Sequence, residues 1–374
     1  MKDHFNEKAP IRFLFPIDGD CINERDGVTD GNAVRVAVKV AAPTGHLIRI
    51  GEREAREENG IYTTDLEIAD RHTVLSAVDL TAGTECRASV FRLPLSVGGY
   101  RISSDDNILF LADITAHRNE YTSIFDNPYL AVYKEAHDLY DAKVHLNLFY
   151  EFTGQAKSYF RTDRPDFDLS MMTDQFKDEF RENADWLKLS FHSRGNTMRP
   201  YENATKELIT RECMQVHREI LRFAGEESLS TCTTLHFGAA NEAAVRAMRA
   251  VGYRVMAGYF IPGRPNPVAY HTSERLIEHI YKRDFFCDTD TDMFFGRIDS
   301  VLNCNTNEEN LHEIAEAVAS PTRGGYIEIM IHEQYFYEDY ELYLSDFRAR
   351  VLDPARYLYE WGYRGRFLSD VIRE

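Results

Sequence analysis

Tyr100-Arg-Ile-Ser-Ser-Asp-Asp-Asn-Ile-Leu-Phe-Leu111 combines an apolar, strand-like run with two adjacent carboxylates, Asp105 and Asp106. Two carboxylates side by side at the end of a buried element repel each other and are costly to bury. A bound cation turns that repulsion into attraction. The stretch therefore predicts a strand that ends at a metal ion, provided that other parts of the chain supply further ligands.

The residues that follow this stretch alternate between strand-like and helix-like runs. The predicted strands cover residues 143–150, 186–191, 253–260 and 325–331, and the predicted helices cover 128–139, 205–224, 240–251, 311–319 and 354–360. The first and last of these helices begin with a capping residue and a proline, Asn127-Pro128 and Asp353-Pro354, which is a common helix start. Repeated units of this kind build a parallel sheet or barrel, with functional groups at the carboxyl ends of the strands.

The first hundred residues follow a different pattern. Apolar and polar residues alternate with a period of two in the runs 33–40, 46–50, 60–68, 73–80 and 88–93. Short strands at this spacing, separated by turn-forming residues, predict a β-sandwich. We expect a multidomain β plus α/β protein, with an immunoglobulin-like β-sandwich over residues 1–97 and an α/β domain over residues 98–374.

Bulk composition narrows the class of partner. The chain has 374 residues, which suggests two domains, and its formal net charge is −18. That sign argues against nucleic acid and against anionic membrane surfaces. The polar start, Met1 to Lys8, has no signal-peptide pattern, and six scattered cysteines show no CxxC spacing. We therefore expect a cytoplasmic protein with reduced thiols and no membrane segment; a homo-oligomer is compatible with these features.

Three histidines follow predicted strands of the second region: His192, His236 and His332. A single histidine at a strand end is more often structural than a ligand. Three of them, together with Asp105-Asp106, reverse that preference, because strand ends in a βα arrangement converge on one rim. The sequence thus predicts a metal-assisted hydrolase.

Residues from about 98 to 374 resemble the polysaccharide deacetylases of carbohydrate esterase family four. The matching segments are Ser104-Asp-Asp-Asn107, Phe191-His-Ser-Arg-Gly-Asn196, Thr234-Leu-His-Phe-Gly238 and Ile329-Met-Ile-His332. The resemblance implies a deformed (β/α) barrel that removes acetyl groups from N-acetylated sugars with a divalent metal, often zinc, although nickel or cobalt also fits. It further implies that Asp105 is the general base, that Asp106 and His192 are metal ligands, and that His332 is the general acid.

Three positions depart from the family pattern. Asn196 stands where a second histidine is expected, Thr234 stands where an arginine would orient the base, and His236 stands where proline is usual. His236 either replaces the missing ligand or is a bystander on the rim. Asn196 is either a weak ligand, a sugar-binding amide or neither.

Aromatic residues near these motifs are candidates for contact with a sugar. They are Tyr335, Tyr337 and Phe237. The alternative for the two tyrosines is packing under a loop.

Taken together, the features predict a metal-dependent hydrolase that cleaves the C–N bond of an N-acylated amino sugar or polysaccharide. The alternative is a catalytically weakened carbohydrate-binding protein on the same barrel, and a third possibility is that the β-sandwich docks a partner or a neighbouring subunit.

Overall fold

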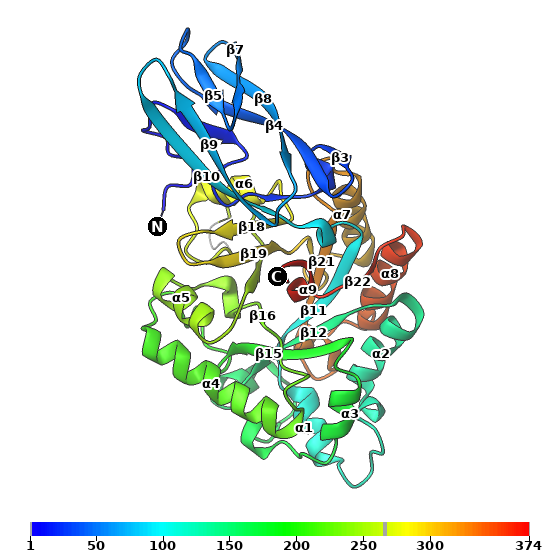
Figure 1. Ribbon diagram of the computed structural model, residues 1–374. Helices are drawn as coiled ribbons and strands as arrows, with labels where there is room; N and C mark the ends of the chain where they lie inside the picture. The colour runs from blue at the N-terminus through cyan, green and yellow to red at the C-terminus, as the bar shows by residue number, and fades with distance from the viewer. Residues whose placement is uncertain (1, 265–267, 374) are drawn as a thin grey trace.

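The computed structural model describes residues 2–264 and 268–373. Figure 1 shows strands in the N-terminal part of the chain and mixed strands and helices in the rest. The N-terminal strands form two five-stranded sheets. The first contains β1 (Arg12–Phe15), β3 (Val28–Asp30), β4 (Ala33–Ala41), β7 (Arg56–Glu58) and β8 (Ile61–Ile68). The second contains β2 (Cys21–Ile22), β5 (Ile48–Ile50), β6 (Arg53–Glu54), β9 (His72–Asp79) and β10 (Thr84–Arg92).

The period-two pattern explains how these two sheets share a core. Successive side chains of a strand point to opposite faces, so every second residue can face the partner sheet. Along β4, Val34, Val36, Val38 and Val40 are fully buried. They belong to one hydrophobic cluster with the apolar residues of the second sheet, including those of β5 (48–50). The expectation of paired sheets in this part of the chain is therefore confirmed.

The remainder of the described chain forms a six-stranded sheet, a four-stranded sheet and a separate pair of strands. The six-stranded sheet contains β11 (Gly99–Asn107), β12 (Val144–Phe149), β15 (Leu187–Ser193), β20 (Ser300–Val301), β21 (Tyr326–His332) and β22 (Arg364–Gly365). The four-stranded sheet contains β16 (Cys232–Thr233), β17 (Val255–Gly258), β18 (Phe285–Asp288) and β19 (Met293–Arg297), and a separate pair contains β13 (Glu151–Phe152) and β14 (Phe167–Asp168). The order β15-β12-β11-β21-β20 is parallel throughout.

A closed barrel does not form within residues 2–264 and 268–373 as a continuous hydrogen-bonded ladder. Closure would require β15 to pair with β16 and β20 to pair with the four-stranded sheet, and neither pair forms among the described strands. At the first junction β16 is short, with two residues, both of which pair with β17. An isolated bridge between Leu189 and Leu229 joins β15 to the segment that precedes β16. The described chain is thus a β plus α/β protein with open sheets.

Helices lie between the strands of this second region. They are α1 (Leu109–Ala116), α2 (Pro128–Tyr140), α3 (Lys177–Glu182), α4 (Lys206–Phe223), α5 (Glu242–Ala250), α6 (Glu274–Ile280), α7 (Asn307–Ala319), α8 (Phe347–Glu360) and α9 (Leu368–Val371). The predicted start of α2 is confirmed, since the Asn127 side chain accepts from the Leu130 amide and Pro128 follows it. The predicted start of the last long helix was wrong. That helix, α8, begins at Phe347 and contains Pro354 in its interior.

The interior proline of α8 is tolerated because the helix has a strongly buried face. A proline removes one backbone hydrogen bond and crowds the preceding turn, at a cost of about 3 kcal/mol. Val351, Ala355 and Leu358 of α8 are fully buried around it. Burying a valine or leucine side chain contributes roughly 1.5–3 kcal/mol each, which offsets that cost.

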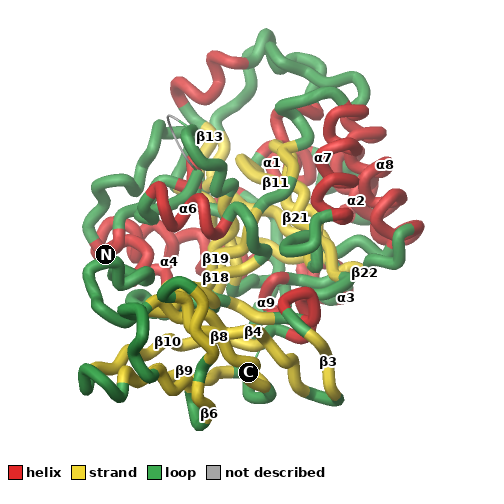
Figure 2. Tube along the Cα trace, turned by 90° about the horizontal axis from the view of Figure 1, so that it is seen from above, coloured by secondary structure: helices red, strands yellow, loops and turns green. Residues whose placement is uncertain are grey.

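The N-terminal sheets pack on the α/β part beside β18. Asp20 forms an isolated bridge with Phe286, and the Cys287 amide donates to the Gly19 carbonyl at 2.8 Å. In the view from above, the strands of the N-terminal sheets gather on one side of the molecule (Figure 2). The chain then passes through a short turn, Pro94–Ser96, into β11.

Candidate metal centre

Both aspartates of the opening stretch reach one cavity because the backbone of β11 is irregular at its end. Adjacent side chains of a regular strand point to opposite faces. Here the register between β11 and β12 shifts between Ser104 and Asn107, and Asp106 adopts a left-handed conformation with φ of 62°. Aspartate tolerates this conformation better than most residues. As a result, Asp105 and Asp106 both line a cavity of about 370 Å³.

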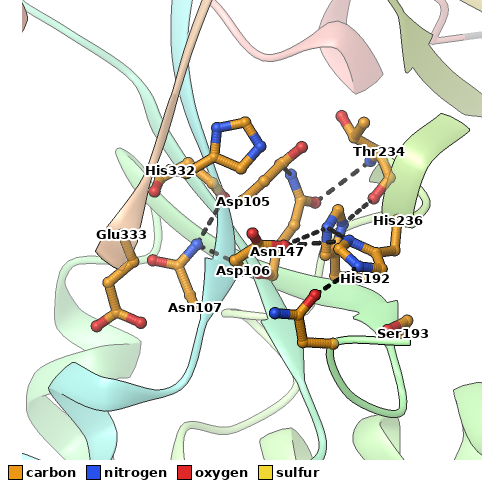
Figure 3. A network of polar contacts seen from close by, with 12 residues as sticks. Asp105, Asp106, Asn107, Asn147, His192, Ser193, Thr234, His236, His332 and Glu333 are labelled. Atoms are coloured by element: carbon orange, nitrogen blue, oxygen red, sulfur yellow. Dashed lines mark hydrogen bonds and ion pairs between the residues drawn. The ribbon is translucent and has the colours of Figure 1, made fainter. Parts of the chain in front are cut away.

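Three side chains from distant parts of the sequence converge beside this cavity. Asp106 lies near the end of β11, His192 lies near the end of β15, and His236 begins the short 3-10 turn η6 (His236–Gly238). The Asp106 Oδ1, His192 Nε2 and His236 Nδ1 atoms lie 3.1 Å from one another in each of the three pairs. Figure 3 shows these side chains pointing toward one another. They form a group that can hold a metal ion.

This triangle has the dimensions that a small divalent cation requires. Zinc binds imidazole nitrogen and carboxylate oxygen at about 2.1 Å, and Asp106, His192 and His236, whose ligand atoms lie 3.1 Å apart, would hold such an ion. Three protein ligands with further positions open is the arrangement of catalytic zinc sites. Two nitrogens and one carboxylate oxygen also suit nickel and cobalt.

Each imidazole is oriented by a contact to its other nitrogen. His192 Nδ1 donates to the Thr234 carbonyl at 2.5 Å, which leaves the lone pair of Nε2 for the centre. His236 Nε2 lies 3.2 Å from the Asn196 Oδ1 atom, and donation in that direction leaves Nδ1 for the centre. Contacts of this kind fix the tautomer and ring orientation of metal-binding histidines. Asn196 thus lies behind His236, where its amide oxygen orients the ring and does not join the three ligand atoms.

The three groups of the cluster shift one another's pKa values in different directions. Burial would lower the pKa of His192, but Asp105 and Asp106 raise it. Burial alone would raise the pKa of Asp106, but the nearby His236 and His192 hold that pKa well below its ordinary value. Burial lowers the pKa of His236, with further lowering from His192 and His332. An ionised carboxylate and a neutral imidazole are the forms that bind metals.

Asp105 is held by a residue that the sequence patterns did not reveal. Asn147 Nδ2 donates to Asp105 Oδ1 at 2.6 Å, and both side chains are almost completely buried. The Asn147 Oδ1 atom accepts from Ser190 at 2.6 Å and from Thr233 at 3.2 Å. Donors on the oxygen side force the amide nitrogen toward Asp105, so the orientation of Asn147 is determined by its surroundings.

His332 lies opposite Asp105 on the neighbouring strand. The two residues are aligned partners in the parallel pair β11–β21. The His332 Nδ1 atom lies 2.8 Å from Asn303 Oδ1 and donates to that oxygen. Nε2 is then the ring nitrogen that can accept or donate a further proton. The side chains of Asp105 and His332 both line the cavity. A substrate bound there would face both a carboxylate and an imidazole.

Two further residues after β21 support the end of β11. Glu333 accepts from the backbone amides of Ile108, Leu109 and Phe110 at 2.6–2.9 Å, and so caps the start of α1. Figure 3 shows its carboxylate pointing away from the histidine cluster. Gln334 Nε2 donates to the second oxygen of Asp106 at 2.9 Å, which leaves Oδ1 directed at the imidazoles.

The three aromatic candidates have different positions. Tyr335 and Phe237 line the cavity, as expected for residues that contact a substrate. Tyr337 is not among the described lining residues. Its hydroxyl donates to Glu333 at 2.9 Å, and Arg164 lies 4.7 Å from its ring centre. The packing alternative therefore describes Tyr337.

The Thr234 side chain also borders the cavity. Its Oγ1 atom is buried and has no hydrogen-bond partner among the described residues. Buried polar atoms are rarely left in that condition, so this hydroxyl is available to a bound molecule or water. Thr234 does not contact Asp105 through any described hydrogen bond; Asn147 makes that contact instead.

Sequence reasoning missed Asn147, Glu333 and Gln334. One signal was present for Asn147, because it is a polar residue near the carboxyl end of the otherwise apolar run Leu146 to Phe149. Glu333 and Gln334 directly follow His332, and nothing in their spacing indicates that they reach back to β11.

Across the described ranges, no helix is long and apolar enough to cross a membrane.

Comparison with known proteins identifies no family. No family model matches the chain, and no curated protein matches it. Among solved structures, a 2,6-sialyltransferase from Vibrionaceae Photobacterium sp. JT-ISH-224, in a ternary complex with the donor product CMP and the acceptor substrate lactose, matches with 8% identity and a TM-score of 0.12. The match covers 95% of this chain and 61% of that chain, so the chain spans less than two thirds of its length. A likeness this weak does not bear on fold or activity.

Proposed function

We propose that this chain is a metal-dependent hydrolase that removes an acyl group, with acetyl as the expected case, from the nitrogen of an amide. The observation that carries the proposal is the triangle of Asp106, His192 and His236 beside an aligned carboxylate and imidazole, Asp105 and His332. This combination supports a resemblance to the polysaccharide deacetylases. The amino sugar or polysaccharide substrate rests on that resemblance alone.

The residues divide the reaction between them. A divalent cation at the triangle, zinc being the first candidate and nickel or cobalt the others, would supply Lewis acidity to a water and to the amide carbonyl. Asp105 accepts the proton of the attacking water, and Asn147 keeps its carboxylate oriented. His332 returns a proton to the departing amine, while its contact to Asn303 fixes the ring. Proton transfers of this kind contribute about 10²–10⁴-fold each.

The fold proposed for this activity is an immunoglobulin-like β-sandwich followed by a deformed (β/α) barrel. The shared core of the two N-terminal sheets supports the first part. The parallel order of β20, β21, β11, β12 and β15, with β16 next along the chain beyond β15, supports an opened barrel as the second. We expect an experimental structure with metal bound to keep the two sheets adjacent at β15 and β16.

Metal analysis and hydrolysis assays test the function together. We expect about one ion per chain in protein loaded with zinc, and hydrolysis of para-nitroacetanilide or N-acetylglucosamine that a chelator abolishes. Asp106→Asn removes the anionic ligand, so both the ion and the activity should be lost. Asp178→Asn is the matched control, because the side chain of Asp178 on α3 is 86% exposed and takes no part in the site.

Two results would contradict the proposal. One is wild-type protein that retains none of zinc, nickel and cobalt after loading, and the other is an Asp106→Asn protein with unchanged metal content. A protein that binds metal and sugar but shows no turnover would support the alternative, a catalytically weakened carbohydrate-binding protein.

A further inference from the structure

The cavity beside the metal centre has an apolar wall that the catalytic groups do not use. Four rings are in successive contact along this wall: Phe152, Phe160, Tyr340 and Tyr335. The ring centres are 5.5 Å apart for Phe152–Phe160, 5.3 Å for Phe160–Tyr340 and 5.2 Å for Tyr335–Tyr340. All four line the cavity, and we call them the ring wall.

Backbone hydrogen bonds hold the two segments of the ring wall together. Phe152 and Phe160 flank the 3-10 turn η4 (Gly154–Tyr159), whereas Tyr335 and Tyr340 lie in and after η7 (Glu333–Phe336). Phe160 and Tyr340 form an isolated β-bridge, and the Glu341 amide donates to the Tyr159 carbonyl at 3.0 Å. The two segments therefore form one continuous wall.

Phe237 supplies a second apolar surface beside the metal ligands. Its ring centre lies 4.5 Å from that of His236, and the side chain is 42% exposed at the cavity. Its φ of 59° is an uncommon conformation for a bulky residue. Strain of this kind persists at sites where it serves a ligand or a mechanism, and here it keeps an exposed ring next to a metal ligand.

Most of the exposed lining of the cavity is apolar, and it includes Phe149, Val268, Val301 and Met330. Arg264 also lines the cavity, where its guanidinium group lies over the ring of Tyr259. A sugar ring carries hydroxyl groups around its edge, and each one buried without a partner costs about 1–3 kcal/mol. Aromatic rings alone can cover the face of a sugar but cannot satisfy those hydroxyls. The lining thus favours a ligand whose body is apolar.

We infer that the substrate is a compact amide with an apolar body, such as an aryl or aralkyl group, and not a polysaccharide chain. The inference rests on the proposed function, because it places the scissile amide at the triangle of Asp106, His192 and His236. A cavity of about 370 Å³ holds one small molecule, at the lower end of the usual range for ligand sites. The body of that molecule lies against the ring wall and Phe237.

Two hydroxamates test this inference on the full-length, zinc-loaded protein. Acetohydroxamate and N-phenylacetohydroxamate share the same acetyl and chelating groups and differ by one phenyl ring on the nitrogen. If that ring is buried against the ring wall, N-phenylacetohydroxamate should bind about 30-fold more tightly by calorimetry. Phe160→Ala should reduce the advantage to about threefold or less, and Phe160→Leu should keep most of it. Trp361→Ala is the control, because Trp361 is 63% exposed and lies outside the cavity lining.

The outcomes separate this inference from the proposed function. Equal affinities for the two hydroxamates, with both bound only when zinc is present, would overturn the apolar substrate and leave the metal hydrolase intact. Hydrolysis of N-acetylglucosamine oligomers with para-nitroacetanilide untouched would do the same. If neither hydroxamate binds the zinc-loaded protein, the inference and the proposed site both fail.

Discussion

Replacing Asn147 with alanine should slow hydrolysis without removing the metal. Asn147 Nδ2 donates to Asp105 at 2.6 Å in a fully buried setting, whereas the side chains of the metal triangle do not depend on that contact. A hydrogen bond to a charged group contributes about 1.5–3 kcal/mol. If that bond orients Asp105 in the transition state, its loss corresponds to a decrease in kcat of about 10–150-fold.

The assay is hydrolysis of para-nitroacetanilide by zinc-loaded protein, with metal content measured on the same samples. We expect KM to stay within about twofold, because Asn147 is not among the described residues that line the cavity. Ser190→Ala is the control. It removes the donor to Asn147 Oδ1, at 2.6 Å, but leaves the bond to Asp105 in place, so its effect on kcat should be much smaller. An Asn147→Ala protein with one bound ion and kcat within threefold of wild type would refute the positioning role.

Two predictions concern residues outside the catalytic group. Burial would lower the pKa of His4, but Asp18 and Asp288 raise it from 6.5 to about 9. The folded state therefore holds this proton more tightly than the unfolded state, so the stability it contributes is present below pH 6.5 and is lost as pH rises toward 9. The difference in unfolding free energy between wild type and His4→Phe should fall by up to about 3 kcal/mol across that window, and a difference that is constant with pH would exclude the linkage. Tyr337→Phe removes the hydroxyl that donates to Glu333, so we expect a loss of about 1 kcal/mol in urea denaturation with unchanged KM. A raised KM would return Tyr337 to the substrate site.

Periodicity predicted the elements whose burial follows one face. The run 33–40 was expected as a strand, and β4 covers Ala33–Ala41. The helix expected over 205–224 is α4, Lys206–Phe223, with a threonine cap at Thr205. The end of the chain was predicted less well, because Pro354 indicates a helix start locally while the buried face of α8 extends the helix toward its N-terminus. Local preference and tertiary packing disagreed there, and packing determined the boundary.

The site was predictable to the extent that it follows from strand ends. Asp106 and His192 were expected at one edge because the carboxyl ends of parallel strands meet there, and His236 joins them, an outcome that the sequence left open. Asn147 escaped detection because all six residues of β12 are buried. His145 and Asn147 alternate with apolar residues in the sequence, but burial of both faces leaves open which face points at the site. A strand buried on both sides gives that face only in the folded structure.

The backbone beside the metal ligands explains why sequence patterns stop short of the geometry. Asp106 and Phe237 both have positive φ, at 62° and 59°, and each costs of order 1–3 kcal/mol. Aspartate tolerates this conformation better than phenylalanine does, so the surrounding structure must enforce it most strongly at Phe237. Gln334, in the turn η7 after β21, holds Asp106. At Gly238 a Cβ atom would lie 2.2 Å from a side-chain carbon of Val268 and 2.8 Å from its Cα, so close contact with Val268 fixes the turn after His236. The two strained residues set the carboxylate and the second imidazole at 3.1 Å, and it follows that substitutions at Gly238 should disturb metal binding without touching a ligand.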